Sequence, residues 1–299
     1  MLERILVATI SLLQRVPLAF RLLIGDLGGR LMSLVPTRER TIARLQLQAC
    51  FPELDTTTLL QNMYAHLGQT ALESINLSPL LSNIDKHVET EGWDEVTALQ
   101  EQEKRFIVLT AHTGNWDLTA AYGIAKGFPV VPVGKVTRMG MLHQVLDDIR
   151  RSYGIHTLWR SEGSSAKDVV RAIHKNKVIC ALIDQDTNVS STHSEFFSIP
   201  AKSPSGLVAL AKKFNLEILV AFNFRIARAR YKLFIHRIDA SLSIESIIDE
   251  YHSLLEYYLR RFPEQWVWIH KRWRTLPDGK TLSSKDYINH LQNHVIQCR

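Results

Sequence analysis

Cysteine is scarce in this chain of 299 residues, which contains only Cys50, Cys180 and Cys298. The three are widely separated and form no C-x-x-C pair. This spacing excludes a disulfide framework and a structural zinc site, and it is typical of a reducing compartment. We therefore expect the functional part of the protein to lie in the cytoplasm, and we expect no metal ion at its site.

Long uninterrupted apolar runs are also absent. Residues 1–35 are rich in Leu, Ile and Val, but arginines and Pro17 interrupt them. No run reaches the ~18 uncharged apolar residues of a spanning helix, and no small-residue cleavage site marks a secretory signal. Apolar bulk with arginines favours helices that lie in the membrane interface. The alternative is a buried helical subdomain with a few solvated arginines.

Charge of one sign does not dominate the composition, which has 36 basic and 30 acidic residues and a formal net charge of +6. A hydrophobic content of 45% and a charged content of 22% indicate a globular protein. No Lys/Arg run, zinc-ligand spacing or RNP-like motif supports nucleic-acid binding. The small basic excess is compatible with an anionic partner, such as a phospholipid surface, a phosphorylated glycolipid or an acidic carrier protein.

The most informative stretch runs from Arg105 to Gly127. Phe106–Ala111 is a short apolar run with β-branched members, which predicts a strand buried on both faces. Asp117 begins a segment that predicts a helix with an acid in its first turn. Thr113–Trp116 is then a crossing from strand to helix, with glycine and asparagine suited to a tight backbone.

His112 and Asp117 flank this crossing. In one continuous helix they would point about 140° apart, but a turn between them lets both converge at the carboxyl end of a strand. A histidine held by a carboxylate is a general base. No G-x-S-x-G motif supplies a nucleophile, and Cys180 lies in an apolar run, so the base would activate a hydroxyl of a substrate. The alternative is a buried structural histidine with a helix-capping Asp.

Strand and helix patterns alternate after this point, and they predict an α/β fold with a largely parallel mixed sheet flanked by helices. We divide the chain into a helical, membrane-associating region at 1–83, an α/β domain at 84–280 and a C-terminal helix at 281–299. Residues 187–198 are predicted to form a loop, and residues 217–225 and 231–238 an antiparallel pair at the sheet edge. The predicted strands are 106–111, 129–136, 155–159 and 178–183, with helices at 139–153, 203–215 and 243–262.

Four polar residues come just after predicted strands, namely His112, Arg138, Arg160 and Asp184. The carboxyl ends of parallel strands meet at one edge, so these residues predict one polar cluster. The two arginines could bind a phosphate or carboxylate, or stabilise negative charge developing at a carbonyl. Surface ion pairs are the alternative for the arginines, and capping of the next loop is the alternative for Asp184.

Near the C-terminus, Trp266, Trp268 and Trp273 alternate with cations. We interpret the tryptophans as core residues, with Trp266, Trp268 and His270 on one face of a strand. We interpret Lys271 and Arg272 as ligand-binding cations. Aromatic residues beside cations also suit a lipid interface, where indole lies at headgroup level.

The run A-H-T-G-N-W-D-L at residues 111–118 resembles the signature of the lipid A biosynthesis acyltransferases, in the lysophospholipid-acyltransferase-like superfamily. The resemblance extends from about Leu12 to Gly279. One departure is Asp117, where members commonly carry Glu. The glycerolipid acyltransferases share H-x-x-x-x-D but carry an E-G-T-R-type block where this chain has Asp184-Gln185-Asp186. Further blocks of similarity are V-T-R at 136–138, W-R at 159–160, L-I-D-Q-D at 182–186, F-F-S-I-P-A at 196–201 and P-E-Q-W-V-W-I-H-K-R-W at 263–273.

The resemblance implies an O-acyltransferase that moves a fatty acyl chain from the thioester of an acyl carrier protein to a hydroxyl of a lipid A precursor. It implies the cytoplasmic face of the inner membrane of a Gram-negative-type bacterium, with no cofactor beyond the thioester co-substrate. His112 would be the base and Asp117 its orienting carboxylate. Residues implied to bind substrate are Asn115, Arg138, Arg160, Asp184, Lys271 and Arg272. The alternatives are another glycolipid acceptor, such as a mannosylated phosphatidylinositol, and a non-catalytic membrane-surface or carrier-binding protein.

Overall fold

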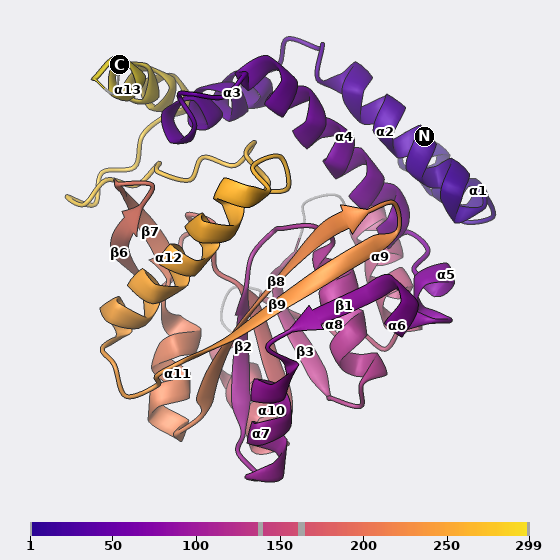
Figure 1. Ribbon diagram of the computed structural model, residues 1–299, viewed down its shortest axis with the longest axis vertical. Helices are drawn as coiled ribbons and strands as arrows, with labels where there is room; N and C mark the ends of the chain where they lie inside the picture. The colour runs from indigo at the N-terminus through magenta and orange to yellow at the C-terminus, as the bar shows by residue number, and fades with distance from the viewer. Residues whose placement is uncertain (1, 137–139, 161–164, 298–299) are drawn as a thin grey trace.

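A seven-stranded mixed sheet forms the centre of the protein (Figure 1). The computed structural model describes residues 2–136, 140–160 and 165–297. The strand order is β1-β9-β8-β2-β5-β3-β4, and every neighbouring pair is parallel except β8–β9. The expectation of a largely parallel mixed sheet is therefore confirmed. The strands are β1 (Val88–Glu91), β2 (Phe106–Thr110), β3 (Val130–Lys135), β4 (Leu158–Arg160), β5 (Val178–Leu182), β8 (Glu217–Ala227) and β9 (Arg230–Ile238).

The β8–β9 hairpin confirms the predicted antiparallel pair, but it does not form the edge of the sheet. The short strand β1 adds to β9 in parallel and forms that edge instead. Its sequence V-E-T-E has no apolar run or strict alternation of hydrophobic residues. Because β1 is recognisable mainly by its backbone pairing, local sequence pattern did not reveal it.

Helices cover both faces of the sheet. On one face, side chains of α11 and α12 join the strands in the larger buried cluster. On the other, α7 and α8 pack over the strands in a second cluster. The predicted apolar face of α12 is confirmed, since Ile247, Ile248, Tyr251 and Leu255 are fully buried. The helices of this part are α7 (Trp93–Glu101), α8 (Trp116–Ala125), α9 (Gly140–Ser152), α10 (Ser165–His174), α11 (Gly206–Phe214) and α12 (Ile244–Arg261).

The first part of the chain is helical, and Figure 1 shows α2 and α4 side by side above the sheet. The two helices approach closely because Gly25 and Gly29 of α2 meet the α4 backbone at Gly68 and Tyr64. Within the described residues, no helix has both the length and the apolar character needed to cross a bilayer. These helices are α1 (Leu2–Leu13), α2 (Leu18–Met32), α3 (Arg38–Cys50), α4 (Thr56–Ser74), α5 (Ser78–Leu81) and α6 (Ile84–His87).

The predicted loop at 187–198 is wrong in its second half. There the chain forms β6 (Ser191–Phe196), which pairs antiparallel with β7 (Ile199–Pro204) as a separate two-stranded sheet. This ribbon packs on α12, where the Ser194 hydroxyl lies 2.9 Å from His252 Nδ1. β6 is mostly polar and only half-buried, so hydrophobic periodicity does not predict it. The helix predicted from residue 203 begins only after β7, as α11.

The tryptophan segment after α12 contains no strand, contrary to expectation, and consists of turns with isolated bridges. Trp266, Trp268 and Trp273 are nevertheless almost completely buried, so their interpretation as core residues is confirmed. The last helix of the described residues is α13 (Ser284–Gln297), close to the predicted terminal helix.

Candidate active site

His112 follows β2 and is held by Asp184, which follows β5. His112 Nδ1 lies 2.8 Å from Asp184 Oδ1, and the His112 backbone N–H donates to Asp184 Oδ2 at 2.8 Å. A carboxylate can only accept, so Nδ1 carries the proton in this contact and Nε2 is left as the basic nitrogen. The His112 side chain is 24% exposed, whereas Asp184 is completely buried.

The sheet register explains why these two residues meet. β2 and β5 are neighbours in parallel, and Thr110 lies opposite Leu182. Two residues further along, His112 and Asp184 leave the sheet at the same level. The sequence placed both residues at one sheet edge, and the adjacency of β2 and β5 brings them into contact.

Trp266 supplies a further hydrogen bond to this pair. Its indole Nε1–H donates to Asp184 Oδ2 at 2.7 Å. Burial raises the pKa of the Asp184 carboxyl, but the charge of His112 and the hydrogen bonds from His112 and Trp266 outweigh burial and lower it from 3.8 to about 2. Asp184 is therefore a stable anion that fixes the His112 tautomer and orients its ring.

Asp117 does not hold His112 in this structure, and the expected orienting role requires correction. Its carboxylate pairs with Arg150 of α9, with Arg150 Nε 3.0 Å from Oδ1 and Nη2 3.4 Å from Oδ2. Asp117 lies in the first turn of α8, where its side chain faces α9. It lines the same cavity as His112, so it remains part of the candidate site.

A cavity of about 440 Å³ opens beside His112. Cations and polar groups from several strand ends line it together with apolar side chains of the sheet and of α9. Among the described residues, Arg160 Nε and Thr187 Oγ1 are buried there without a hydrogen-bond partner. The polar residues lining the cavity include His112, Asp117, Lys135, His143, Arg150, Arg160, Gln185 and Thr187.

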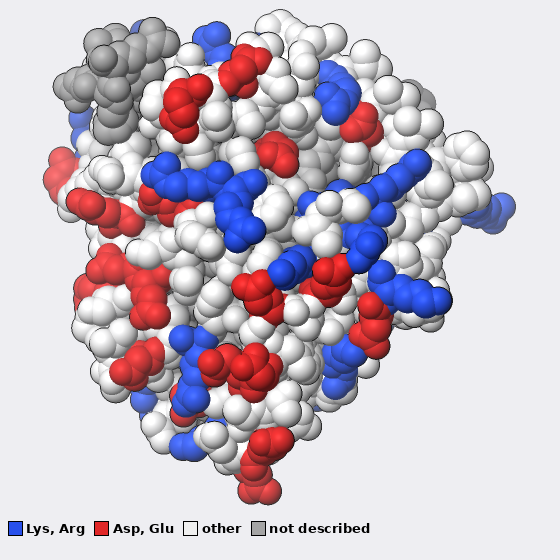
Figure 2. Space-filling model, viewed as in Figure 1, with Lys and Arg blue, Asp and Glu red and all other residues white. Residues whose placement is uncertain are grey.

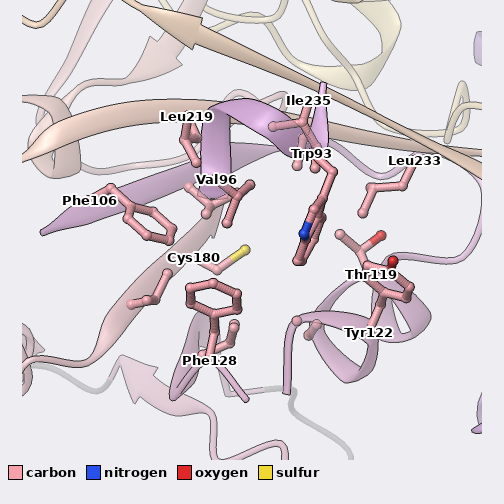
Figure 3. A pocket seen from close by; sticks show the side chains of 16 residues that line it. Trp93, Val96, Phe106, Thr119, Tyr122, Phe128, Cys180, Leu219, Leu233 and Ile235 are labelled. Carbon is pink, nitrogen blue, oxygen red and sulfur yellow. The ribbon is translucent and has the colours of Figure 1, made fainter. Parts of the chain in front are cut away.

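A smaller apolar pocket of about 60 Å³ adjoins this cavity. In Figure 3 the rings of Trp93, Phe106 and Phe128 surround it, with the Cys180 sulfur directed inward. Ala120 and Cys180 line both spaces, so the apolar pocket lies directly behind the cavity wall.

Asn115 does not reach the cavity, which corrects its expected role in substrate binding. Its side chain is completely buried. Asn115 Oδ1 accepts from the Leu118 backbone N–H at 3.1 Å and caps α8, while Nδ2 donates to Glu73 Oε2 at 3.2 Å. Asn115 thus shapes the crossing from strand to helix.

Arg272 is also misassigned as a ligand-binding cation. It is completely buried, and its guanidinium donates to the Lys202 carbonyl and to Ser203 Oγ. Lys271 is half-buried and donates to Ser284 Oγ at 2.8 Å. Neither residue lines the cavity beside His112. The segment forms turns rather than a strand, so its side chains do not alternate regularly between two faces.

Arg138 lies outside the described residues, so the cluster predicted from strand ends is described for His112, Arg160 and Asp184. The sequence does not predict the roles of Arg150 and Trp266 in the site. Arg150 lies in a helix 33 positions after Asp117, with no local signal beyond a basic last turn. The sequence predicts Trp266 only as a core residue, because its hydrogen bond to Asp184 joins distant parts of the chain. Among the described residues, no three His, Cys, Asp or Glu side chains are placed to hold a metal ion.

Comparison with known proteins shows a match to one family over most of the chain. Residues 2–275 match the model of the bacterial lipid A biosynthesis acyltransferases. The match includes every residue of the candidate site described above.

Individual relatives are distant. The chain is 22% identical to a lipid A biosynthesis acyltransferase of Haemophilus influenzae, over 82% of this chain and 79% of that protein. It is 23% identical to a lipid A biosynthesis palmitoleoyltransferase of Escherichia coli, over 82% of this chain and 81% of that protein. A phosphatidylinositol mannoside acyltransferase of Mycobacterium tuberculosis is 24% identical over half of this chain and 47% of its own length.

Proposed function

Because the chain belongs to the bacterial lipid A biosynthesis acyltransferase family, we propose that it transfers a fatty acyl group from an acyl carrier protein thioester to a hydroxyl of a lipid A precursor. The observation that carries this proposal is the His112–Asp184 pair at the wall of a mixed polar and apolar cavity. A histidine fixed in this way can remove a proton from a hydroxyl.

The reaction proceeds by direct transfer. His112 Nε2 takes the proton of the acceptor hydroxyl as its oxygen attacks the thioester carbonyl. The new C–O bond forms, the C–S bond breaks, and the imidazolium returns the proton to the departing thiolate. Asp184 stabilises the imidazolium throughout. Cys180 is a poor competing nucleophile, because burial raises the pKa of its thiol to about 12.

The cations of the cavity are suited to an anionic acceptor. Arg160 and Lys135 lie opposite each other at the ends of β4 and β3, and both line the cavity. The Nε of Arg160 has no partner among the described residues, so a phosphate oxygen of a glycolipid would satisfy it. Arg138, although outside the described residues, remains a candidate for the same role.

The apolar pocket behind the cavity is suited to the acyl chain. Its aromatic and aliphatic lining (Figure 3) offers nothing to a polar headgroup but would bury methylene groups. Because Ala120 and Cys180 border both spaces, a chain entering the pocket would leave its thioester beside His112.

A lipid surface is the proposed location, on the cytoplasmic side of the inner membrane. α2 and the turn after it expose several large apolar side chains. The surfaces of water-soluble proteins rarely carry so many of them on one helix. The tip of the β8–β9 hairpin lies beside α2, since Arg228 donates to the Ala19 carbonyl. Figure 2 shows acidic and basic side chains interspersed over the β8–β9 hairpin. The exposed apolar residues are Phe20, Leu23, Ile24, Leu27, Leu31, Met32, Leu34 and Val35.

A second acceptor class deserves a direct comparison, because one relative acts on a phosphatidylinositol mannoside. The experiment combines two donors, an acyl carrier protein thioester and a coenzyme A thioester, with two acceptors, a lipid A precursor and a mannosylated phosphatidylinositol. Products are identified by mass spectrometry, and His112→Ala serves as the inactive control.

We expect one acyl unit to be added to the lipid A precursor from the carrier protein, and almost none by His112→Ala. Transfer only to the mannoside would overturn the proposed acceptor, and transfer only from coenzyme A would overturn the proposed donor. A folded wild-type protein that transfers to neither acceptor would support a non-catalytic membrane-surface or carrier-binding role.

A further inference from the structure

Glu73 of α4 is a buried carboxylate directly behind the crossing that carries His112. It is completely buried and receives both arms of Arg225, with Nη1 2.6 Å from Oε1 and Nη2 2.8 Å from Oε2. The Tyr231 hydroxyl also donates to Glu73 Oε2. Asn115 Nδ2 also donates to Glu73 Oε2, at 3.2 Å. The carboxylate therefore links two strands of the sheet to the loop at residues 113–115.

Two more side chains of α4 contact the same loop. Thr70 Oγ1 donates to the Gly114 carbonyl at 2.9 Å, and His66 Nε2 lies 3.2 Å from the same oxygen. Burial and the charge of Arg225 lower the pKa of His66 to about 3, so the neutral ring can donate from Nε2. His66, Thr70 and Glu73 are spaced by four and three positions, which places them on one face of the helix.

The loop has little freedom on its other side. Gly114 has a φ of +52°, and a Cβ there would lie 2.2 Å from the Asn223 carbonyl oxygen. The Asn115 carbonyl accepts from Asn223 Nδ2 at 3.1 Å. The loop is thus enclosed between β8 and α4, while Asp184 holds His112 from the neighbouring strand.

We propose that His66, Thr70 and Glu73 form a clamp that positions His112 for catalysis, with Glu73 as its principal positioning residue. This inference rests on the proposed acyl transfer. Glu73 acts through Asn115, whose side chain caps α8 and fixes the turn between His112 and the first helical residues. The N-terminal helical region would then be part of the catalytic unit as well as a membrane contact.

The test compares Glu73→Gln with Glu217→Gln, a matched control. Glu217 pairs with Arg237 at 2.9 Å on the same two strands but does not approach the loop. We expect Glu73→Gln to lower kcat about 10- to 100-fold with KM little changed, because small misplacement of a reacting group has effects of this size. The control should retain the wild-type kcat. An unchanged kcat in folded Glu73→Gln would overturn the clamp.

Thr70→Val is the second variant, since it removes one hydroxyl and leaves every charge in place. Thr70→Val tests the clamp even if Glu73→Gln fails to fold. We expect it to lower kcat by a smaller factor than Glu73→Gln. A double-mutant cycle with Asn115→Ser, which keeps a capping hydroxyl, tests the route through Asn115. Additive losses in kcat would exclude that route.

Hydrogen exchange provides a readout that needs no turnover. Peptides covering residues 112–119 should exchange faster in Glu73→Gln and Thr70→Val than in the wild type or in Glu217→Gln. Equal exchange in all four proteins would refute the clamp. Failure of the proposed function would instead appear as an inactive wild-type protein, whatever the exchange rates of the variants.

Discussion

Among single residues, the carboxylate that orients His112 is the one whose side chain reaches His112 Nδ1. Asp184 makes this contact at 2.8 Å, whereas Asp117 makes an ion pair with Arg150. Both carboxylates border the same site, yet their partners differ. Asp184 acts on the base, and Asp117 holds the wall formed by α9.

This difference predicts unequal effects of two amide substitutions. Asp184→Asn should lower kcat about 10²- to 10⁴-fold, because an amide cannot stabilise the imidazolium and can favour the wrong tautomer. Asp117→Asn leaves the His112–Asp184 contact intact and should lower kcat less. Initial rates at saturating donor, with circular dichroism to check folding, provide the measurement. A larger loss in Asp117→Asn would return the orienting role to Asp117.

The buried side chain of His66 predicts that the stability of the protein depends on pH. Burial and the charge of Arg225 lower the pKa of His66 to about 3, well below the ordinary 6.5. The unfolded chain therefore takes up a proton near pH 6.5 while the folded protein does not. The free energy of unfolding is therefore highest above pH 6.5, where His66 is neutral in both states. It falls as the pH drops from 6.5 toward the pKa of His66 in the folded protein.

We expect the free energy of unfolding to fall by up to about 1.4 kcal/mol per pH unit for this one histidine between roughly pH 6.5 and 4. His66→Gln should give a shallower dependence. Urea unfolding at a series of pH values measures both slopes. Equal slopes for the two proteins would mean that His66 protonates in the folded state as it does in the unfolded chain.

Among the elements, the close contact between α2 and α4 depends on glycines of α2, which have no side chain to separate the two backbones. A Cβ on Gly29 would lie 2.1 Å from the Tyr64 carbonyl oxygen and 2.7 Å from the Ala65 Cα. Both are backbone atoms, so neither can move aside without displacing a helix. The neighbouring Gly28 has nothing within 4 Å of its position for a Cβ.

These neighbours form a matched pair for mutation. Gly29→Ala should lower the free energy of unfolding by about 1–3 kcal/mol, since overpacking forces the helices apart. Gly28→Ala should raise it by up to about 1 kcal/mol through helix propensity. Urea denaturation of both variants tests the prediction. Equal stabilities would show that α2 can shift along α4 without loss.

For the whole molecule, the two faces of α2 have different environments. Gly25 and Gly29 face α4, while Leu27 and Leu31 on the opposite face are 53% and 66% exposed. The exposed side chains recur at three- and four-residue spacing along the helix. A lipid surface would bury them while the catalytic part of the protein stays in the water.

The double variant Leu27→Glu/Leu31→Glu should therefore bind vesicles of anionic phospholipid at least tenfold more weakly, since a tenfold change requires only about 1.4 kcal/mol. Co-sedimentation with the vesicles measures the bound fraction. Leu54→Glu/Leu242→Glu changes two exposed leucines outside α2 and is the control. Equal weakening by both double variants would assign binding to charge rather than to α2.

Much of the fold could be predicted from local pattern. The apolar runs at β2 and β5 predict buried strands, and the run at β3 predicts a strand that is half-buried in the structure. The apolar face of α12 repeats with the period of a helix and so predicts its burial. β1 and the β6–β7 ribbon could not be predicted in this way, since polar sequence forms strands there only through its neighbours. The burial of Asn115 and Arg272 likewise depends on segments far away in the chain.

The sequence by itself determined that a histidine ends a buried strand, that a carboxylate opens the next helix, and that the surrounding motif is that of an acyltransferase family. Only the tertiary structure decided which acid serves the histidine. β5 is far from β2 in the chain but adjacent in the sheet, and their register brings Asp184 to His112. Strand order arises from long-range pairing and packing, which local periodicity does not encode.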